Sequence, residues 1–280
     1  MPFIENNTNG VVYMTAPNID AKHAFTTRIG GVSTGIYESL NLGQSLGDDR
    51  ALVRENYGIL CGALGITCDD IVGSHQVHGA QVRVVTKADR GDVFVKTSHI
   101  ADGLITIEHG VALAVFSGDC VPILLHDPVS GAIGAVHAGW RGTVADIAGA
   151  AVSRMSEEYG CNPADIRAAI GPCISKCCFE TDSDVTDALH SVLPEAAGNC
   201  YERRGEKYMT DLKEANRLLL QRAGVHDISI SDECTSCRSD KYWSHRRTKG
   251  KRGSQAAIIF RHCGRDPQSP DINNSKGSSK

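Results

Sequence analysis

The chain has 280 residues, enough for a substantial buried core, and its apolar and charged fractions of 41% and 22% are ordinary for a globular protein. The formal net charge of −4 gives no overall basic field, so we expect neither nucleic acid nor an anionic membrane as a partner. Residues 1–30 carry no charged start followed by an apolar run, and no stretch reaches the roughly 20 apolar residues of a membrane span. We therefore expect a cytoplasmic protein.

Cysteine is frequent, with eleven in the chain. An odd count without an export signal argues against a disulfide framework and favours reduced thiols. We expect most of these thiols to be small buried apolar groups and some to be metal ligands or nucleophiles.

The first half of the chain combines short apolar runs with one helical pattern. Apolar positions at helical spacing predict a helix over residues 48–64. The apolar runs predict strands over residues 11–14, 23–27, 71–73, 81–86, 111–117, 121–126 and 132–136. Glycine-rich turns follow at residues 28–33 and 137–142.

The second half repeats this mixture. Helices are predicted over residues 143–159, with Thr143 as N-cap and Gly160 as the stop, and over residues 211–223. Strands are predicted over residues 166–170 and 228–231. Residues 242–246 and 256–260 are interpreted as a hairpin whose solvated turn carries a run of basic side chains.

The order of the predicted elements suggests a fold class. We find no internal repeat and no linker, so we predict one domain over residues 1–264. Residues 265–280 consist of residue types that cannot build a core and are predicted to be a disordered tail. Strands occur both singly between helices and in consecutive pairs. This favours an α+β (mixed α/β) domain, with mixed β-sheets flanked by helices, over a doubly wound sheet.

Three short segments place metal-type ligands beside glycine at the ends of apolar strands. They contain His78, Cys120 and His137. Two imidazoles and one thiolate would hold zinc and leave its fourth position open. The three residues are far apart in the sequence, so spacing alone is weak evidence, and each has a structural alternative as a loop histidine, a core thiol or a buried hydrogen-bonded histidine. His75 could replace His78 as a ligand.

At these segments the sequence resembles the polyphenol oxidase laccase-domain family, also called the peptidoglycan editing factor family, whose bacterial members are described as purine nucleoside phosphorylases. The matching segments, in one order, are residues 27–33, 39–43, 76–79, 101–103, 118–122, 137–142, 170–172 and 244–247. The resemblance implies a cysteine-hydrolase-like laccase-domain fold with zinc bound by His78, Cys120 and His137. It also implies phosphorolysis of adenosine, inosine and S-methyl-5'-thioadenosine, and deamination of adenosine.

Phosphorolysis holds a phosphate anion beside a nucleoside, so it needs positioned cations. We assign phosphate or ribose contact to Arg28 and a supporting role to Arg141, with a surface ion pair as the alternative for each. Orientation of the ligands is assigned to Gln76 or Asp119. The predicted catalytic residues are Cys120, His137 and Arg28, and the predicted substrate contacts are Arg28, Arg141 and Gln76.

Three other functions are compatible with the same residues. A soft thiolate site could bind copper, but the chain has no His-x-His pair, which disfavours a multicopper phenol oxidase. A Cys-His hydrolase, with Cys120 as nucleophile and His137 as base, would suit an amidase that edits a peptidoglycan precursor. The third is a non-catalytic metal-binding module.

Five further thiols fall in two short segments of the chain. They are Cys173, Cys177, Cys178, Cys234 and Cys237. Together they could hold a structural metal or form a redox pair. A single CxxC without a second matching pair is a weak zinc signal, so we favour buried or incidental thiols.

Overall fold

The computed structural model describes residues 2–95 and 97–261, so the predicted tail lies outside the described residues. Two six-stranded sheets form most of the fold. The first sheet has, in spatial order, β1 (Ile4–Thr8), β2 (Val11–Thr15), β3 (Lys22–Thr26), β15 (Gln255–Phe260), β7 (Ala112–Ser117) and β4 (Ile71–Val72). The second has β14 (Asp227–Ile230), β10 (Arg167–Ile170), β8 (Val121–His126), β9 (Ile133–Ala138), β6 (Gly103–Thr106) and β5 (Val82–Val84).

Both large sheets are mixed. In the first sheet β4 runs parallel to β7 and the other pairs are antiparallel. In the second sheet β5 and β6 are parallel, as are β10 and β14, and the remaining pairs are antiparallel. This confirms the predicted mixed α+β class, since strands joined through helices can run parallel whereas directly connected neighbours pair antiparallel.

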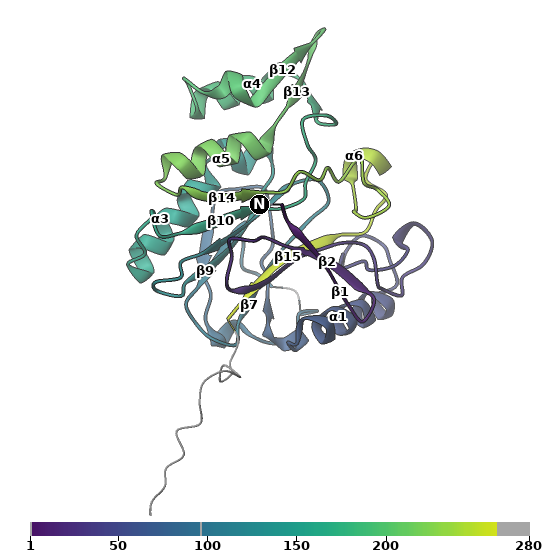
Figure 1. Ribbon diagram of the computed structural model, residues 1–280. Coiled ribbons are helices and arrows are strands. Elements are labelled where there is room, and N and C mark those ends of the chain that lie inside the picture. The colour runs from purple at the N-terminus through teal and green to yellow at the C-terminus, as the bar shows by residue number, and fades with distance from the viewer. Residues whose placement is uncertain (1, 96, 262–280) are drawn as a thin grey trace, which may run out of the picture.

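The two sheets pack face to face and helices cover their outer faces (Figure 1). Apolar side chains of both sheets share one core, including Leu113 and Ile259 from the first and Leu124 and Ala135 from the second. Helix α1 (Arg50–Leu64) covers the first sheet. Helices α3 (Ile147–Tyr159) and α5 (Leu212–Arg222) cover the second. The four layers therefore bury both faces of the central strands, which explains why β7, β8, β9 and β15 are near-continuous apolar runs.

A small subdomain extends from the second sheet. It has the three-stranded sheet β11 (Glu180–Thr181), β13 (Lys207–Thr210) and β12 (Tyr201–Arg204), with helix α4 (Ser183–Val192) beside it. In Figure 1 these elements lie at the top, above α5. The remaining short helices are α2 (Trp140–Val144), α6 (His245–Thr248), η1 (Gly35–Tyr37), η2 (Cys68–Asp70), η3 (Lys87–Asp89) and η4 (Ala197–Cys200).

The predicted hairpin near the C-terminal end is wrong. Residues 245–248 form α6, because the Ser244 side chain accepts a hydrogen bond from the backbone N–H of Arg247 and so caps a helical turn. Strand β15 then pairs with β3 and β7, which come from much earlier in the chain. The predicted helix over 143–159 is in fact two helices, α2 and α3, and Thr143 lies inside α2 instead of capping it.

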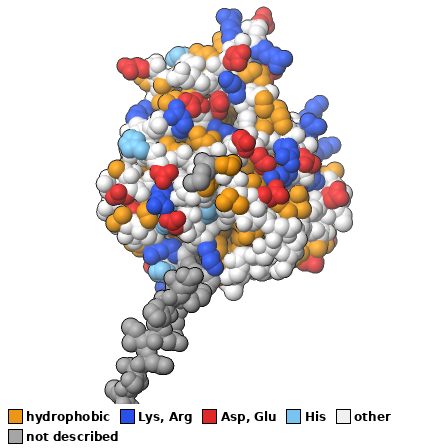
Figure 2. Space-filling view, in the orientation of Figure 1, with side chains coloured by type: hydrophobic (Ala, Val, Ile, Leu, Met, Phe, Trp, Pro, Cys, Tyr) orange, Lys and Arg blue, Asp and Glu red, His pale blue; other side chains and the backbone are white. Residues whose placement is uncertain are grey.

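Acidic and basic side chains are intermixed on the face of the molecule that Figure 2 shows. This agrees with the small net charge of −4. Within residues 2–95 and 97–261, none of the helices combines the length and apolar character needed to cross a bilayer.

Candidate metal centre

His78, Cys120 and His137 meet at one end of the second sheet. His78 lies in the loop between β4 and β5, Cys120 in the turn between β7 and β8, and His137 within β9. Their ligand atoms all lie within 4.8 Å of one another, and Cys120 Sγ is 3.7 Å from His78 Nε2. The two imidazole rings stand edge to face with centroids 4.9 Å apart. The three predicted ligands are thus brought together, and His75 is not part of this group.

The backbone around the three ligands is constrained. His78 itself has a φ of 62°, a left-handed conformation that non-glycine residues rarely adopt. Gly139 follows β9, and a Cβ there would lie 2.5 Å from His78 Cδ2 and 3.3 Å from Cys120 Sγ. Only glycine therefore lets the backbone after His137 pass beside both other ligands.

Asp102, just before β6, organises the centre. Its buried carboxylate accepts hydrogen bonds from the backbone N–H groups of Val77, His78 and Gly79, at 2.9–3.0 Å. It also accepts from His137 Nδ1 at 2.8 Å. The carboxylate therefore places the His137 proton on Nδ1 and leaves Nε2 to face Cys120 and His78.

The electrostatics favour a charged thiolate at Cys120. Burial opposes its ionisation, but hydrogen bonds and positive charge from His137 and His78 outweigh burial and lower the pKa of Cys120 to about 6. Burial likewise opposes a charged His137, yet Asp102 and Cys120 together raise the pKa of His137 to about 9. Burial of Asp102 is outweighed by its hydrogen bonds from His137, Gly79 and Val77, and its pKa falls to about 2. Thiolate and imidazole are both suited to a divalent metal.

Sequence reasoning did not assign Asp102 any role. The feature that could have indicated it is the Ala-Asp-Gly segment directly before an apolar strand. An aspartate buried at such a position needs hydrogen-bond donors around its carboxylate. Ligand orientation was expected from Gln76 or Asp119, and the hydrogen bonds of both side chains go to groups other than the three candidate ligand side chains. The Gln76 amide instead exchanges two hydrogen bonds of 2.8 Å with the backbone of Phe116. Asp119 accepts from Thr235 Oγ1 and from the backbone N–H of Arg246, both at 2.6 Å.

The two predicted anion-binding arginines stack on tryptophans. The Arg28 guanidinium lies 3.9 Å from the ring centroid of Trp243 and donates to two backbone carbonyl oxygens. The Arg141 guanidinium lies 4.2 Å from the ring centroid of Trp140. Cation–π stacking of this kind positions a guanidinium and leaves some of its N–H donors available.

A third arginine, Arg252, lies against the turn that carries Cys120. Its guanidinium occupies the space that a side chain at Gly118 would need. Burial lowers the pKa of Arg252, and the nearby Asp119 and Cys120 partly oppose that effect. Its buried Nε has no hydrogen-bond partner among the described residues. The sequence analysis places Arg252 in a solvated hairpin turn. Its contact with Gly118 joins residues far apart in the chain, and such a contact leaves no signal in the local sequence.

Comparison with known proteins identifies the family of this chain. Residues 22–262 match the family model described as multi-copper polyphenol oxidoreductase laccase. The chain belongs to this family. Over 251 residues it is 43% identical to the purine nucleoside phosphorylase YlmD of Geobacillus stearothermophilus, covering 88% of this chain and 92% of that protein.

Two further comparisons extend the laccase-family match. A purine nucleoside phosphorylase of Deinococcus radiodurans is 41% identical over 251 residues, which cover 89% of this chain and 93% of that protein. The crystal structure of YlmD from Geobacillus stearothermophilus superposes with a TM-score of 0.88 at 41% identity, covering 93% of this chain and 100% of that chain. The predicted family and its mixed α+β fold are thereby confirmed.

Proposed function

We propose that this chain is a zinc-dependent purine nucleoside phosphorylase that acts on adenosine, inosine and S-methyl-5'-thioadenosine and also deaminates adenosine. One observation carries the proposal. His78, Cys120 and His137 converge within 4.8 Å in a chain that is 43% and 41% identical to two proteins named purine nucleoside phosphorylase.

The donor set fits zinc. Imidazole nitrogen and thiolate are both zinc ligands, and three protein ligands leave a fourth position for a small oxygen ligand, as in catalytic zinc sites. The hydrogen bond of His137 to Asp102 is the support that zinc-binding histidines usually have. A zinc ion held here would supply Lewis acidity at its open position.

The proposed reactions need both anion binding and proton transfer. In phosphorolysis a phosphate oxygen bonds to ribose C1' while the N-glycosidic bond breaks, and the purine leaves with the bonding pair and takes up a proton. In deamination the oxygen of water bonds to C6 and the amino group leaves as ammonia. We propose that Arg28, Arg141 and Arg252 hold phosphate or ribose by charge-assisted hydrogen bonds. Arg252 is the strongest of these candidates, since its unpaired Nε lies beside the Cys120 turn.

An assay with adenosine at varied phosphate concentration tests the proposal. We expect adenine and ribose 1-phosphate in amounts that rise and saturate with phosphate, and inosine with ammonia when phosphate is omitted. The His137→Ala variant should lower both rates by roughly 100-fold or more, because losing a ligand removes the metal. Adenine release that does not depend on phosphate, or product formation that survives in His137→Ala, would overturn the assignment.

The same assay assigns the phosphate contact. Arg252→Ala should raise the KM for phosphate by roughly tenfold or more, which corresponds to one lost charge-assisted hydrogen bond. Arg28→Ala should act in the same direction if Arg28 binds phosphate, and an unchanged KM removes its assignment. Arg203→Ala is the matched control, because Arg203 is exposed on β12.

A Cys-His hydrolase is the second candidate, and a specific arrangement favours it. Cys120, His137 and Asp102 follow the order nucleophile, base and orienting carboxylate. A hydrolase of this type would accumulate an acyl intermediate on Cys120, and chelators would leave its activity unchanged.

Elemental analysis of the purified protein distinguishes bound zinc from the copper that the family description names.

A further inference from the structure

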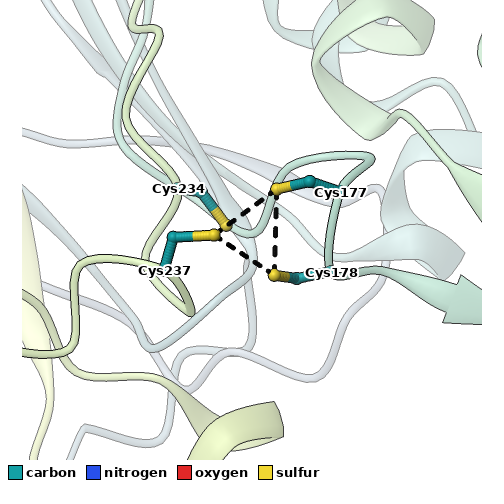
Figure 3. Close-up of side chains that lie close together, drawn as sticks. All are labelled: Cys177, Cys178, Cys234 and Cys237. Carbon is teal, nitrogen blue, oxygen red and sulfur yellow. Dashed lines mark hydrogen bonds between the residues drawn. The ribbon is translucent and has the colours of Figure 1, made fainter.

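Four cysteines outside the centre described above form a second cluster. Cys177 and Cys178 lie in the turn between β10 and β11, and Cys234 and Cys237 lie in the turn after β14. Their sulfur atoms all lie within 4.8 Å of one another and point toward a common centre (Figure 3). We refer to these four residues as the tetrathiol cluster. Cys173 is buried nearby and is not part of it.

Sheet topology brings the two turns together. Strands β10 and β14 are parallel neighbours, so both end at the same edge of the second sheet. An isolated parallel bridge between Cys173 and Cys234 continues the pairing beyond the strands. The tetrathiol cluster therefore joins two turns that are adjacent in space and far apart in sequence.

We propose that the tetrathiol cluster binds a structural zinc ion through four thiolates. Zinc–sulfur bonds of about 2.3 Å in a tetrahedron place the sulfurs about 3.8 Å apart. The sulfur of Cys178 lies 3.7 Å from that of Cys177 and 3.4 Å from that of Cys237, and the sulfurs of Cys177 and Cys237 are 3.6 Å apart. These separations suit a shared ion, whereas a disulfide needs about 2.05 Å, and every described cysteine is free.

The backbone around the cluster is arranged for thiolates. The backbone N–H of Ser175 donates to Cys234 Sγ at 3.4 Å. N–H donors directed at a sulfur stabilise its negative charge when it is a ligand. Within the other turn, the N–H of Cys178 donates to the Ser175 carbonyl oxygen at 2.9 Å, and this bend directs two adjacent cysteines to one side.

Binding needs no redox partner. Each thiol releases its proton to solvent as its sulfur binds, and no electron is transferred. Cys177 and Cys237 are exposed, which gives the ion a route in from solvent.

The tetrathiol cluster also borders the catalytic region. The backbone N–H of Ile174, in the first turn, donates to the Asp119 carbonyl oxygen at 2.9 Å, and Thr235, in the second, donates to the Asp119 carboxylate at 2.6 Å. Asp119 directly precedes Cys120 in the chain. An ion that joins the two turns would therefore hold the Cys120 turn in place, so we assign it a structural role.

Zinc content per chain tests the inference. We expect two zinc ions in the purified protein, one in His137→Ala, one in Cys237→Ser and none in the double variant. Cys68→Ser is the matched control and should keep two, since Cys68 also has a sulfur neighbour, Cys61 at 3.3 Å, but lies in neither metal group. Cys237→Ser should also lower the melting temperature by several degrees, because zinc binding to the folded state contributes to stability.

The outcomes separate this inference from the proposed function. One zinc in the native chain and none in His137→Ala would overturn the tetrathiol site, whether or not Cys237→Ser folds. One zinc in the native chain that persists in His137→Ala but is lost in Cys237→Ser would support the tetrathiol site and contradict the catalytic zinc. Alkylation of the unfolded, unreduced protein should modify all eleven cysteines. Protection of Cys177, Cys178, Cys234 or Cys237 from alkylation would mean that they form disulfides and would overturn the inference.

Discussion

At the scale of single residues, Asp102 connects the elements of the metal centre. It binds the backbone of the His78 loop through three N–H groups and the ring of His137 through Nδ1. Replacing the Asp102 carboxylate leaves its buried donors without an acceptor. The resulting loss of folding free energy should therefore exceed the loss from breaking an exposed ion pair. The same contacts position two of the proposed metal ligands, His78 and His137, at once.

Asp102→Asn tests this role. We expect zinc affinity at the centre to fall by roughly 10–100-fold, and the zinc-free protein to lose about 3–5 kcal/mol of stability at pH 7. Folding lowers the pKa of Asp102 from 3.8 to about 2, so its contribution is complete above about pH 5 and is lost as the pH falls toward 2. Urea denaturation from pH 7 to pH 2 should show the difference between native and variant shrinking below about pH 5.

Two observations check this interpretation. Asp165→Asn should change neither zinc affinity nor stability measurably, since Asp165 is exposed. A constant stability difference between the native protein and Asp102→Asn across the acid range would show that the carboxylate charge is not what stabilises the loop.

At the scale of elements, the break between α2 and α3 sets the direction of α3, the longer helix that follows β9. Asp146 has a φ of 57°, and its side chain accepts from the Gly149 backbone N–H at 3.1 Å as the N-cap of α3. It also pairs with Arg222 of α5 at 2.7 Å. A continuous helix from residue 143, as the apolar spacing predicted, is excluded because the left-handed residue turns the chain.

Asp146→Ala should destabilise the protein by about 2 kcal/mol, since it removes the cap and places alanine in a left-handed conformation. Asp146→Asn keeps a capping oxygen, and asparagine tolerates the left-handed conformation. The loss of stability should be well under 1 kcal/mol, even though the exposed ion pair with Arg222 is also lost. Denaturation midpoints in urea measure both. Equal losses for the two variants would contradict a capping role.

At the scale of the whole molecule, the close approach of the two large sheets makes the site possible. Gly171, which follows β10 of the second sheet, lies against the ring of Phe25 in β3 of the first, with no room for a side chain. Loops from both sheets can then meet, and Cys120 is carried by the turn that crosses from β7 in one sheet to β8 in the other.

Gly171→Ala should therefore destabilise the protein by about 1–3 kcal/mol through overpacking against Phe25. Gly58→Ala is the matched control. Gly58 lies in α1 with open space around it, so alanine there should stabilise by about 0.5–1 kcal/mol. Melting temperatures should thus move in opposite directions, and a neutral Gly171→Ala would mean that the sheets can separate at no cost.

The sequence by itself predicted most of the local structure and the three residues that we propose as metal ligands. Apolar runs predicted the central strands, helical spacing predicted α1 and α5, and the family resemblance indicated His78, Cys120 and His137. These signals succeed because periodicity, turn chemistry and side-chain type are properties of short segments. The mixed α+β class followed from the order of the elements.

Only the tertiary structure decided which distant segments meet. Strand order decides which strands pair with β15 and where Asp102 lies. It also places Arg252 beside Gly118 and gathers four cysteines, Cys177, Cys178, Cys234 and Cys237. A pair of adjacent cysteines and a CxxC become one site only because β10 and β14 are parallel neighbours. Which strands are neighbours is set by packing between the sheets, a long-range interaction that leaves no periodic trace in the chain.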